Sequence, residues 1–595
     1  MYTLIDFADA YGAEGLHAQF SHPLHLLVAN KLSEVLPLLQ AVSDYAAQGL
    51  WCVGFVRYEA APAFDSACQV HPHTDGLPLA WFGVYQQALP PGPPATELLP
   101  PLAWQQGQTR EAFDTSIHTI HQAIRSGDVY QVNYTSPLHA SLPPDTQEAA
   151  MQAWFDALRR AQPGGYAAHI DTDQETVLSV SPELFFDWRG DQLLMRPMKG
   201  TARRGKDAQD DAARAGALRA SPKEQAENVM IVDLVRNDIS RIALPHSVKV
   251  PRLFHLQALP TVWQMTSDVQ AQTRPGTSLV DVFKALFPCG SITGAPKLQA
   301  MHLIRALEPQ ARGLYCGAIG VVRPGGHATF NVAIRTISAH KGIAQCGIGS
   351  GITADASTHG EWDEWRAKRE FLERTSQEFE LLETLALDKG QYRHLDLHLQ
   401  RMQRAAQHFA YDCNAIAVKA ALAQLAARYP EGLHRVRLRS NAQGHVQVQA
   451  FAVQEVTQSV QLRLAKSPME EAHSEFVRFK TTRRAHYDAF TPTDPTDFDT
   501  LLFNADGQLT ECTRGNIALL IDGQWLTPPV DCGLLAGVGR SVALKEGWLQ
   551  EAVLSIAQDL QRAQALRFIN SLRGCLPAHL ASHSISGYWE TQGIS

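Results

Sequence analysis

The chain has 595 residues, a formal net charge of -8, 45% hydrophobic residues and 19% charged residues. This length allows several hydrophobic cores, and the composition is that of folded globular domains rather than of a disordered chain. The negative charge gives no basic footprint for nucleic acid, and no apolar stretch approaches the roughly 18 residues that span a bilayer, so neither a nucleic-acid nor a membrane partner is expected.

Cysteine usage indicates the compartment. The nine cysteines are scattered and contain no CxxC pair. Free thiols in a reducing compartment fit this pattern better than a disulfide framework or a zinc site. The first residues, MYTLIDFADAYGAEG, lack the basic region and apolar run of a signal peptide. A cytoplasmic protein is therefore expected.

Composition shifts divide the chain into two domains. A proline-rich segment at 86–104 predicts a surface connector between an N-terminal part, 1–85, and a block dense in motifs. This first domain is expected to cover 1–372. The polar segment 373–380 reads as a linker, and a new pattern of strand, DKG turn, short strand and helix opens the second domain, 381–595.

Helix signals are clear at 221–243. Ser221 suits the N-cap, Pro222 the first helical position, and Glu224 the third position of a capping box. Glu227 lies on the same face one turn further along and has no such structural explanation. The segment therefore predicts a helix with a candidate functional carboxylate near its start.

A second acidic pair, Glu361 and Glu364, again shares one face of a predicted helix. Two such pairs could converge on a hard divalent cation such as Mg²⁺, which takes one or two protein carboxylates together with substrate oxygens and water. Solvated surface carboxylates are the alternative for each pair. A solvated surface lysine is likewise the alternative for Lys199 in the segment RPMKGTARRG.

An ordered set of segments resembles the chorismate-utilising enzymes, which include anthranilate synthase component I, aminodeoxychorismate synthase component I, and isochorismate and salicylate synthases. The matching segments, in chain order, are GDVYQVNYTSPL, SPELFF, RPMKGT, AENVMIVDLVRND, FPCGSITGAPKLQAM, RGLYCGAIG, FNVAIRTI and GIGSGITAD followed by HGEWDEW. The resemblance implies an α+β fold with large antiparallel sheets and outer helices.

The same resemblance implies the residues of a first site. Glu227 and Glu364 would ligate Mg²⁺, with Glu224 and Glu361 close by. The implied contacts with chorismate come from Thr293, Tyr315, Arg335 and the backbone of Gly349 to Gly351. A guanidinium suits a carboxylate, and glycines allow backbone N–H groups to come close to a ligand.

The lysine of PMKGT distinguishes subfamilies, because aminodeoxychorismate synthases carry PIKGT where anthranilate-forming relatives carry PIAGT. Lys199 would attack ring carbon C2, and Glu183 would be the general acid and base for the departing hydroxyl. The attack requires a neutral amine, which burial or nearby cations favour. Gln264 stands where many relatives have a histidine, so only hydrogen bonding is expected there.

A second lysine, Lys480, lies in FVRFKTTRRAHYDAF, and Glu511 follows in GQLTECTRGNIALL. A surface lysine is again the alternative. However, an ordered set of segments resembles the fold-type IV pyridoxal-phosphate (PLP) enzymes, namely branched-chain and D-amino acid aminotransferases and aminodeoxychorismate lyase. The matching segments are LLETLAL, HLQRM, FKTTRR, LTECTRGNI, LLAGVGR and FINSLRGCLPA.

This second resemblance implies a smaller, two-lobed α/β domain that binds PLP. Lys480 would form the Schiff base, and Glu511 would pair with the pyridinium nitrogen. The phosphate would be held by Arg401 and the backbone of Gly537, Val538 and Gly539, and Thr384 would supply an active-site hydroxyl. The domain is shorter at its N-terminal edge than its relatives, and homodimerisation through it is left open.

The fusion predicts a bifunctional enzyme of the folate pathway. The first domain would aminate chorismate to 4-amino-4-deoxychorismate, and the second would eliminate pyruvate to leave 4-aminobenzoate. Two alternatives stay open: an anthranilate synthase fused to an aminotransferase, and a non-catalytic chorismate-binding protein. No G-x-C-x-G segment is present, so ammonia is expected from a separate glutamine amidotransferase subunit or from free ammonium.

Overall fold

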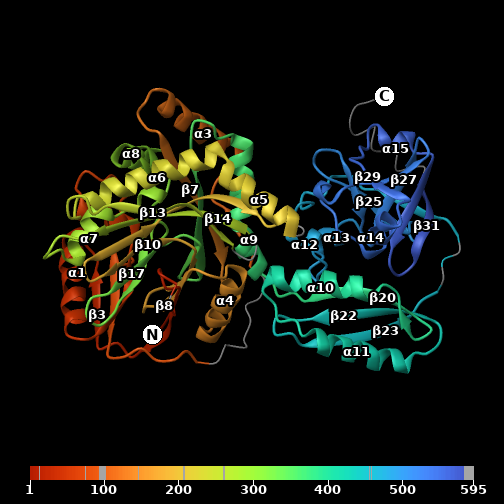
Figure 1. Cartoon of the computed structure of the whole chain (residues 1–595), viewed down its shortest axis with the longest axis horizontal. Coiled ribbons are helices and arrows are strands. Elements are labelled where there is room, and N and C mark those ends of the chain that lie inside the picture. The colour runs from red at the N-terminus through yellow and green to blue at the C-terminus, as the bar shows by residue number, and fades with distance from the viewer. Residues whose placement is uncertain are drawn as a thin grey trace. The chain divides into compact units, whose positions relative to one another are not determined.

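The structure is a computed structural model in which two compact units are distinguished, Met1–Gln377 and Glu378–Ser595 (Figure 1). It describes residues 1–12, 14–73, 76–92, 102–144, 146–205, 208–258, 262–454, 456 and 458–581. Residues 93–101 of the predicted proline-rich connector, 86–104, lie outside the described residues. Among the described residues, no helix is long and apolar enough to cross a membrane.

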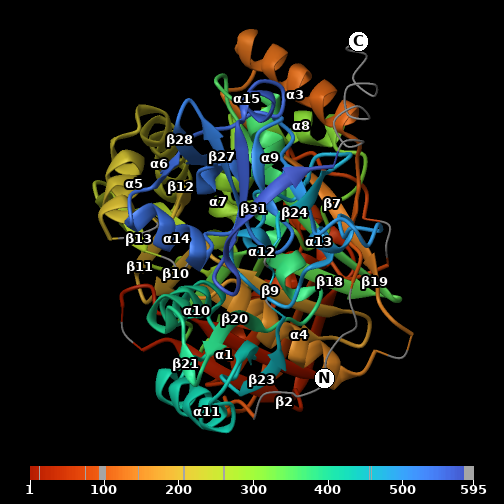
Figure 2. The same cartoon turned by 90° about the vertical axis from the view of Figure 1, so that its right-hand side faces the viewer.

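Two large sheets form the frame of the first unit, and all their strand pairs are antiparallel, as predicted. The first sheet runs in the order β15 (Gly294–Ala295), β7 (Gln131–Ser141), β19 (Ile343–Ile352), β18 (Thr336–His340), β9 (Thr176–Ser181), β8 (Tyr166–Asp171), β1 (Tyr2–Phe7) and β2 (Leu16–Ser21), with β6 (Gln105–Gln106) also paired to β7. Strands β18 and β19 lie beside each other in Figure 2.

The second sheet of this unit carries the strand of Lys199. Its order is β12 (Met198–Arg203), β14 (Val262–Gln272), β11 (Gln192–Arg196), β10 (Leu184–Arg189), β17 (Ala328–Val332), β16 (Ala318–Val322), β4 (Trp51–Val56), β5 (Ala80–Tyr85) and β3 (His25–Ala29), with β13 (Lys249–Ala258) also paired to β14. Buried side chains from this sheet and its helices form one large apolar core.

The helices of the first unit pack by apolar faces. They are α1 (Leu32–Ala47), α2 (Ala61–Phe64), α3 (Arg110–Arg125), α4 (Glu148–Ala161), α5 (Ala208–Ala220), α6 (Pro222–Ser240), α7 (Leu279–Leu286), α8 (Lys297–Leu307) and α9 (Thr358–Thr375), with the short turns η1 (Tyr58–Ala60) and η2 (Gly290–Ile292). In α3, Phe113, Ile117 and Ile120 are buried at helical spacing.

The predicted start of α6 is confirmed. Ser221 is the N-cap and accepts a hydrogen bond from the Glu224 amide at 3.4 Å, and Pro222 is the first helical residue. The Glu224 carboxylate lies elsewhere than in a capping box: a Cβ atom on Gly200 would lie 2.9 Å from its Oε2. It is therefore directed toward the strand that carries Lys199.

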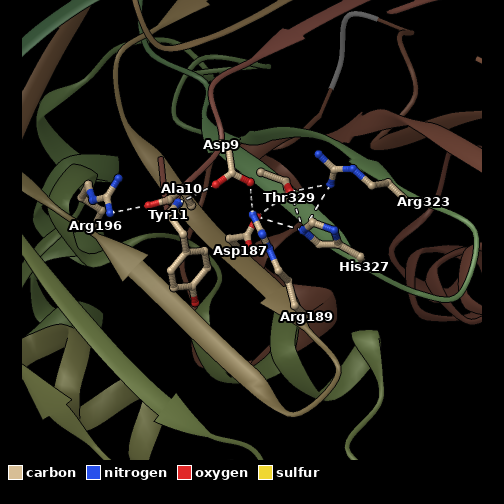
Figure 3. A network of polar contacts seen from close by, with 9 residues as sticks. All are labelled: Asp9, Ala10, Tyr11, Asp187, Arg189, Arg196, Arg323, His327 and Thr329. Carbon is tan, nitrogen blue, oxygen red and sulfur yellow. Dashed lines mark hydrogen bonds and ion pairs between the residues drawn. The ribbon is translucent and has the colours of Figure 1, made fainter. Parts of the chain in front are cut away.

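The N-terminal segment joins the second sheet through a polar network (Figure 3). Arg189 donates to Asp187 at 2.7 Å and to Asp9 at 2.5 Å, and Arg196 donates to the Ala10 carbonyl at 2.7 Å. Burial would raise the pKa of Asp187, but hydrogen bonds from His327 and Arg189 hold it below its ordinary value. The network thus fixes the chain after β1 on the β10–β11 hairpin.

The second unit has two lobes, each built on one sheet. The first lobe has the sheet order β21 (Gln391–Tyr392), β20 (Leu381–Asp388), β22 (Leu433–Ser440) and β23 (Val446–Ala452), with helices α10 (Leu395–Phe409) and α11 (Ala415–Arg428). Apolar side chains of the helices and the sheet share one core. Figure 2 shows both helices beside this sheet.

The other lobe has a mixed sheet, in which β24 runs parallel to both of its neighbours. The sheet order is β26 (Leu509–Cys512), β25 (Asp499–Phe503), β24 (Val460–Leu464), β31 (Gly574–Leu580), β30 (Ala565–Asn570), β27 (Asn516–Ile521), β28 (Gln524–Thr527) and β29 (Leu549–Glu551). The short helices are α12 (Glu475–Arg478), α13 (Ala485–Asp488), α14 (Val538–Lys545) and α15 (Asp559–Arg562), with the turn η3 (Val530–Cys532).

Candidate functional site

Strand β12 places the amine of Lys199 against the glycines of β19. A Cβ atom on Gly351 would lie 2.8 Å from Lys199 Nζ and 2.2 Å from Gln131 Nε2. Gly349 is similarly confined, because a Cβ there would lie 2.5 Å from the Tyr134 carbonyl oxygen. Glycine is therefore required at both positions if the amine and the neighbouring strand are to come this close.

Glu183, immediately before β10, lies near this amine and is 3% exposed. Burial raises its pKa to about 7, although a hydrogen bond from Ser291 and the positive charge of Lys199 oppose the shift. Its Oε1 has no hydrogen-bond partner among the described residues. A carboxyl group that titrates near neutral pH and has a free oxygen suits a general acid and base.

The four predicted metal-site carboxylates belong to two helices, α6 and α9, and influence one another. Burial raises the pKa of Glu224, and the charges of Glu364 and Glu361 raise it further. Burial and the neighbouring Glu224 also raise the pKa of Glu227. In contrast, Glu364 has a lowered pKa, because Lys368 at 2.5 Å outweighs the effect of burial.

Glu361 and Glu227, like Glu364, also have partners within the protein. Glu361 accepts a hydrogen bond from Ser350 Oγ at 2.5 Å, and Glu227 lies 4.0 Å from Lys223. Across the described ranges, no three His, Cys, Asp or Glu side chains are arranged to hold a metal ion. The donor chemistry nevertheless fits Mg²⁺, because these carboxylates raise the pKa of one another and a hard divalent cation would stabilise their negative charges.

Of the predicted substrate-binding side chains, Tyr315 lies against the glycines of β19. Burial raises the pKa of Tyr315 far above its ordinary value, and a Cβ on Gly347 would lie 2.2 Å from the Tyr315 ring. The Arg335 guanidinium donates to the Lys368 carbonyl and stacks on Phe371 at 5.0 Å, and burial lowers its pKa. Tyr315 therefore lies against a glycine of β19, whereas the Arg335 guanidinium is held on α9.

The hydroxyl of Thr293, another predicted substrate contact, bonds within its own turn. It donates to the Cys289 carbonyl at 3.1 Å, and the residue is fully buried. Its carbonyl accepts from the Asn133 amide at 2.8 Å. The hydroxyl proton is thus used within the turn, which leaves only its lone pairs for a ligand.

Gln264 supports the lysine strand. Its Nε2 donates to the Gly200 carbonyl at 2.8 Å, and its Oε1 accepts from the Thr201 hydroxyl at 3.0 Å. A neutral amide donates one of these bonds and accepts the other at the same time. A neutral histidine could make both bonds only if each of its two ring nitrogens lay at the right place. The departure from histidine therefore keeps a hydrogen-bonding function between β14 and β12.

Three polar residues of this site were missed by sequence reasoning. Gln131 is 0% exposed, and neither atom of its amide has a partner among the described residues. Ser291 bonds Glu183, and Lys368 Nζ donates to the Gly349 carbonyl at 2.9 Å. Gln131 and Ser291 lie inside the matched segments, but Lys368 follows HGEWDEW, so only its i+4 spacing from Glu364 pointed to it.

In the second unit, Lys480 follows α12 and is held by backbone pairing, since the Leu382 amide donates to its carbonyl at 3.0 Å. Burial and the positive charges of Arg484 and Arg401 lower its pKa to about 7. A substantial fraction of this amine is therefore neutral at neutral pH, which is the form that condenses with an aldehyde.

Glu511, on β26, is buried and tightly bonded. The Tyr487 hydroxyl donates to Oε1 at 2.6 Å, and the Leu535 amide donates to the same oxygen at 3.1 Å. Asn516 Nδ2 lies 3.4 Å from Oε2. Burial raises the pKa of Glu511 to about 7 despite these bonds. A carboxyl group held in this way can share a proton with a ring nitrogen.

The residues predicted to hold the phosphate lie at the start of α14, where Gly537 is the N-cap. A Cβ on Gly537 would lie 2.1 Å from Asn516 Oδ1, and one on Gly539 would lie 2.8 Å from the Asn570 carbonyl carbon. Val538 is buried between them. The residues present fit the phosphate of PLP, because a helix N-terminus with glycines on both sides of a buried valine offers its amides to an anion.

Arg401 lies beside these residues, but its guanidinium already donates to Glu383 and to a main-chain carbonyl. Its Nε and Nη2 donate to the two oxygens of Glu383 at 2.8 and 2.6 Å, while Nη1 donates to the Ala536 carbonyl at 3.3 Å. Thr384, the next residue after Glu383, is half-buried on β20, and its carbonyl accepts from Ser571 Oγ at 3.5 Å. Glu383 was not predicted, although it belongs to the LLETLAL segment.

Comparisons with known proteins agree with both resemblances. The model of the chorismate binding enzyme family matches residues 13–374, and that of class IV aminotransferases matches residues 380–581. Aminodeoxychorismate synthase component 1 of Escherichia coli (strain K12) is 40% identical over 261 residues, which are 44% of this chain and 56% of that protein. Anthranilate synthase component 1 of Aquifex aeolicus (strain VF5) is 33% identical over 261 residues, 44% of this chain and 52% of that protein.

The chain thus spans just over half the length of these relatives. Among solved structures, anthranilate synthase component I from Streptococcus pneumoniae TIGR4 matches with a TM-score of 0.53 and 24% identity, covering 62% of this chain and 91% of that chain. This match supports the fold of the first unit. The chain belongs to the chorismate binding enzyme family and carries a class IV aminotransferase domain after it.

Proposed function

We propose that the first unit aminates chorismate to 4-amino-4-deoxychorismate and that the second releases pyruvate from this product to give 4-aminobenzoate, a folate precursor. The observation that carries the first assignment is the Lys199 amine beside Gly351 and near the buried Glu183. An anthranilate-forming relative would have no use for an amine at this place. The relatives that are named aminodeoxychorismate synthase component 1 support the same choice.

In the first step, the neutral Lys199 amine forms a bond to ring carbon C2 as the C4 hydroxyl departs with a proton from Glu183. Ammonia then bonds to C4, the C2–N bond breaks, and the electron pair returns to the Lys199 nitrogen. Glu183 is restored by taking up the proton that ammonia loses. Glu227 and Glu364 would hold Mg²⁺, which would neutralise the ring carboxylate of chorismate.

In the second unit, bound PLP would act as an electron sink for a carbanion at the substrate carbon. Lys480 would remove the proton from that carbon as the bond to the enolpyruvyl oxygen breaks, which leaves an aromatic ring. The same lysine would return the proton to the methylene carbon of the departing group, which leaves as pyruvate. Glu511 would hold the proton of the cofactor ring nitrogen, and Arg401 with Gly537 to Gly539 would hold the phosphate. The lowered pKa of Lys480 supports its use as a base near neutral pH.

Ammonia would come from a separate glutamine amidotransferase subunit or from free ammonium. The purified chain is therefore expected to turn over chorismate with ammonium and not with glutamine alone. Turnover with glutamine alone, measured as product formed per chain, would contradict this source of nitrogen.

The deciding experiment is product identification after incubation with chorismate, ammonium, Mg²⁺ and PLP. We expect 4-aminobenzoate and pyruvate from the wild-type chain, neither product from Lys199→Ala, and accumulated aminodeoxychorismate from Lys480→Ala. Formation of 2-aminobenzoate would assign the first unit as an anthranilate synthase. Binding of chorismate without any product would favour a non-catalytic binding protein.

A further inference from the structure

A buried arginine joins distant segments of the first unit. Arg312 is 6% exposed, and its Nε and Nη2 donate to the two oxygens of Glu308 at 2.9 and 2.7 Å. Nη1 also donates to the Ile292 carbonyl at 2.7 Å, and Nη2 to the Asn133 carbonyl at 2.7 Å. Glu308 Oε1 in turn accepts from the amide and hydroxyl of Thr135, both at 2.9 Å. This pair therefore ties η2 to β7.

Each of the joined segments carries a residue of the amination site. Turn η2 contains Ser291, which bonds Glu183, and β7 begins with Gln131. Tyr315 follows Arg312 closely in the chain, and the Arg312 amide donates to Glu59 at 2.8 Å. The segments are far apart in sequence, so their relative positions depend on long-range bonds of this kind.

A pair of this kind is not explained by stability alone. A buried ion pair often contributes no more to stability than apolar side chains of the same volume would, because both charges lose their hydration. A guanidinium fork, however, fixes several acceptors in one plane with defined directions. The acceptors here are a carboxylate and two main-chain carbonyls, so the pair sets the geometry of the backbone that bears the site.

We propose that Arg312 and Glu308 are a positioning pair for the amination site. The pair holds Ser291 against Glu183 and keeps Gln131 beside Gly351, where the Lys199 amine also lies. The proposal rests on the amination proposed above. Misplacement of a reacting group by about 1 Å costs on the order of 10²-fold in rate. Weakening the pair should therefore lower kcat while the chain stays folded.

The principal variant is Arg312→Lys, which keeps a positive charge facing Glu308 but lacks the fork that reaches both carbonyls. Glu308→Gln is the second variant, because its amide oxygen still accepts from Thr135 while the charge is lost. Arg189→Lys is the matched control: it makes the same change in an arginine–aspartate pair of the same unit, with Asp187, in the network of Figure 3.

Three measurements on the full chain distinguish positioning from general destabilisation. These are kcat and KM for chorismate with ammonium, the pH dependence of kcat, and amide hydrogen exchange in 131–135 and 290–293. For Arg312→Lys we expect kcat to fall about 10²-fold. The limb of the pH profile that reports Glu183 should move to higher pH, because loss of the Ser291 hydrogen bond disfavours the charged carboxylate. Exchange should be faster in both segments, and Arg189→Lys should resemble the wild type.

The proposal is overturned if folded Arg312→Lys keeps the wild-type kcat and pH profile, or if Arg189→Lys loses as much activity. If Arg312→Lys does not fold, Glu308→Gln decides by the same measurements. If the wild-type chain does not aminate chorismate, the proposed function fails, and hydrogen exchange alone decides: unchanged protection of both segments in the variant then overturns the positioning role.

Discussion

Burial raises the pKa of three carboxyl groups, those of Glu59, Glu183 and Glu511, to about 7. A carboxyl whose folded pKa exceeds its ordinary 4.5 makes the folded state bind more protons than the unfolded state. The stability that each group contributes is therefore fully present below pH 4.5 and is lost as pH rises through about 7. Glu183 and Glu511 belong to the candidate sites. Part of this loss of stability therefore comes from groups that the proposed reactions use.

Glu59 lies outside both sites and allows this effect to be tested. Its Oε1 accepts from the Arg312 and Gly313 amides, and Oε2 has no hydrogen-bond partner among the described residues. In Glu59→Gln, we expect the fall in unfolding free energy between pH 4.5 and about 7 to become shallower, by roughly 1.4 kcal/mol for each pKa unit of the shift. Urea unfolding across this pH range measures it. Exposed Glu148→Gln is the control, and an unchanged slope in Glu59→Gln would show that this carboxyl does not titrate as stated.

Arg484 controls the basicity of Lys480. A neighbouring cation favours the neutral amine, so Arg484→Gln should raise the Lys480 pKa from about 7. The rate at which the cofactor-free chain takes up PLP should then reach its plateau at a higher pH, which the absorbance of the bound cofactor reports. Arg562→Gln, which removes an exposed partner of Asp522, should leave this profile unchanged. Identical profiles for the two variants would contradict the electrostatic role of Arg484.

At the scale of elements, β19 is shaped by its neighbours. Alternate residues of this strand face the same side, and the three glycines at 347, 349 and 351 lie on that side. Side chains there would meet the Tyr315 ring, strand β7 and the Lys199 amine, respectively. This row of three glycines, called the strip below, therefore lets aromatic, cationic and amide groups come close to the backbone of β19.

Gly351→Ala tests the strip. The added methyl group would displace both Lys199 Nζ and Gln131 Nε2, so we expect amination to fall by on the order of 10²-fold while the chain folds normally. Product formation from chorismate and ammonium, compared with circular dichroism, checks this. Gly216→Ala in α5 is the matched control, because a Cβ there meets no atom within 4 Å. Wild-type amination in Gly351→Ala would mean that Lys199 is not confined by β19 during turnover.

At the scale of the whole molecule, each of the two units has hydrophobic cores of its own. Those of the first unit include the core around Phe283 and Phe330, and those of the second include the cores around Leu519 and Phe409. A unit with its own core can unfold as a separate cooperative transition.

Calorimetry of the full chain is therefore expected to show two transitions. Saturation with PLP at 100 times its dissociation constant stabilises the unit that binds it by about 2.7 kcal/mol. Only the second unit should respond, and a chain limited to 1–377 should not. A single transition, or a shift of the first unit by PLP, would contradict this division of cofactor binding.

Local patterns in the sequence determined the elements whose causes are local. Ser221 and Pro222 mark the start of α6 because capping and a fixed φ angle act within one turn, and the spacing of Phe113, Ile117 and Ile120 marks the buried face of α3. The ordered motifs also identified the two families, the antiparallel sheets and the residues to examine in both sites.

Only the tertiary structure decided the state of those residues. Burial of Glu183, the unsatisfied amide of Gln131 and the bonds of Arg312 depend on segments as much as 179 residues apart. Desolvation and Coulombic interactions depend on which atoms surround a group in space, and a pattern read along the chain does not contain those distances.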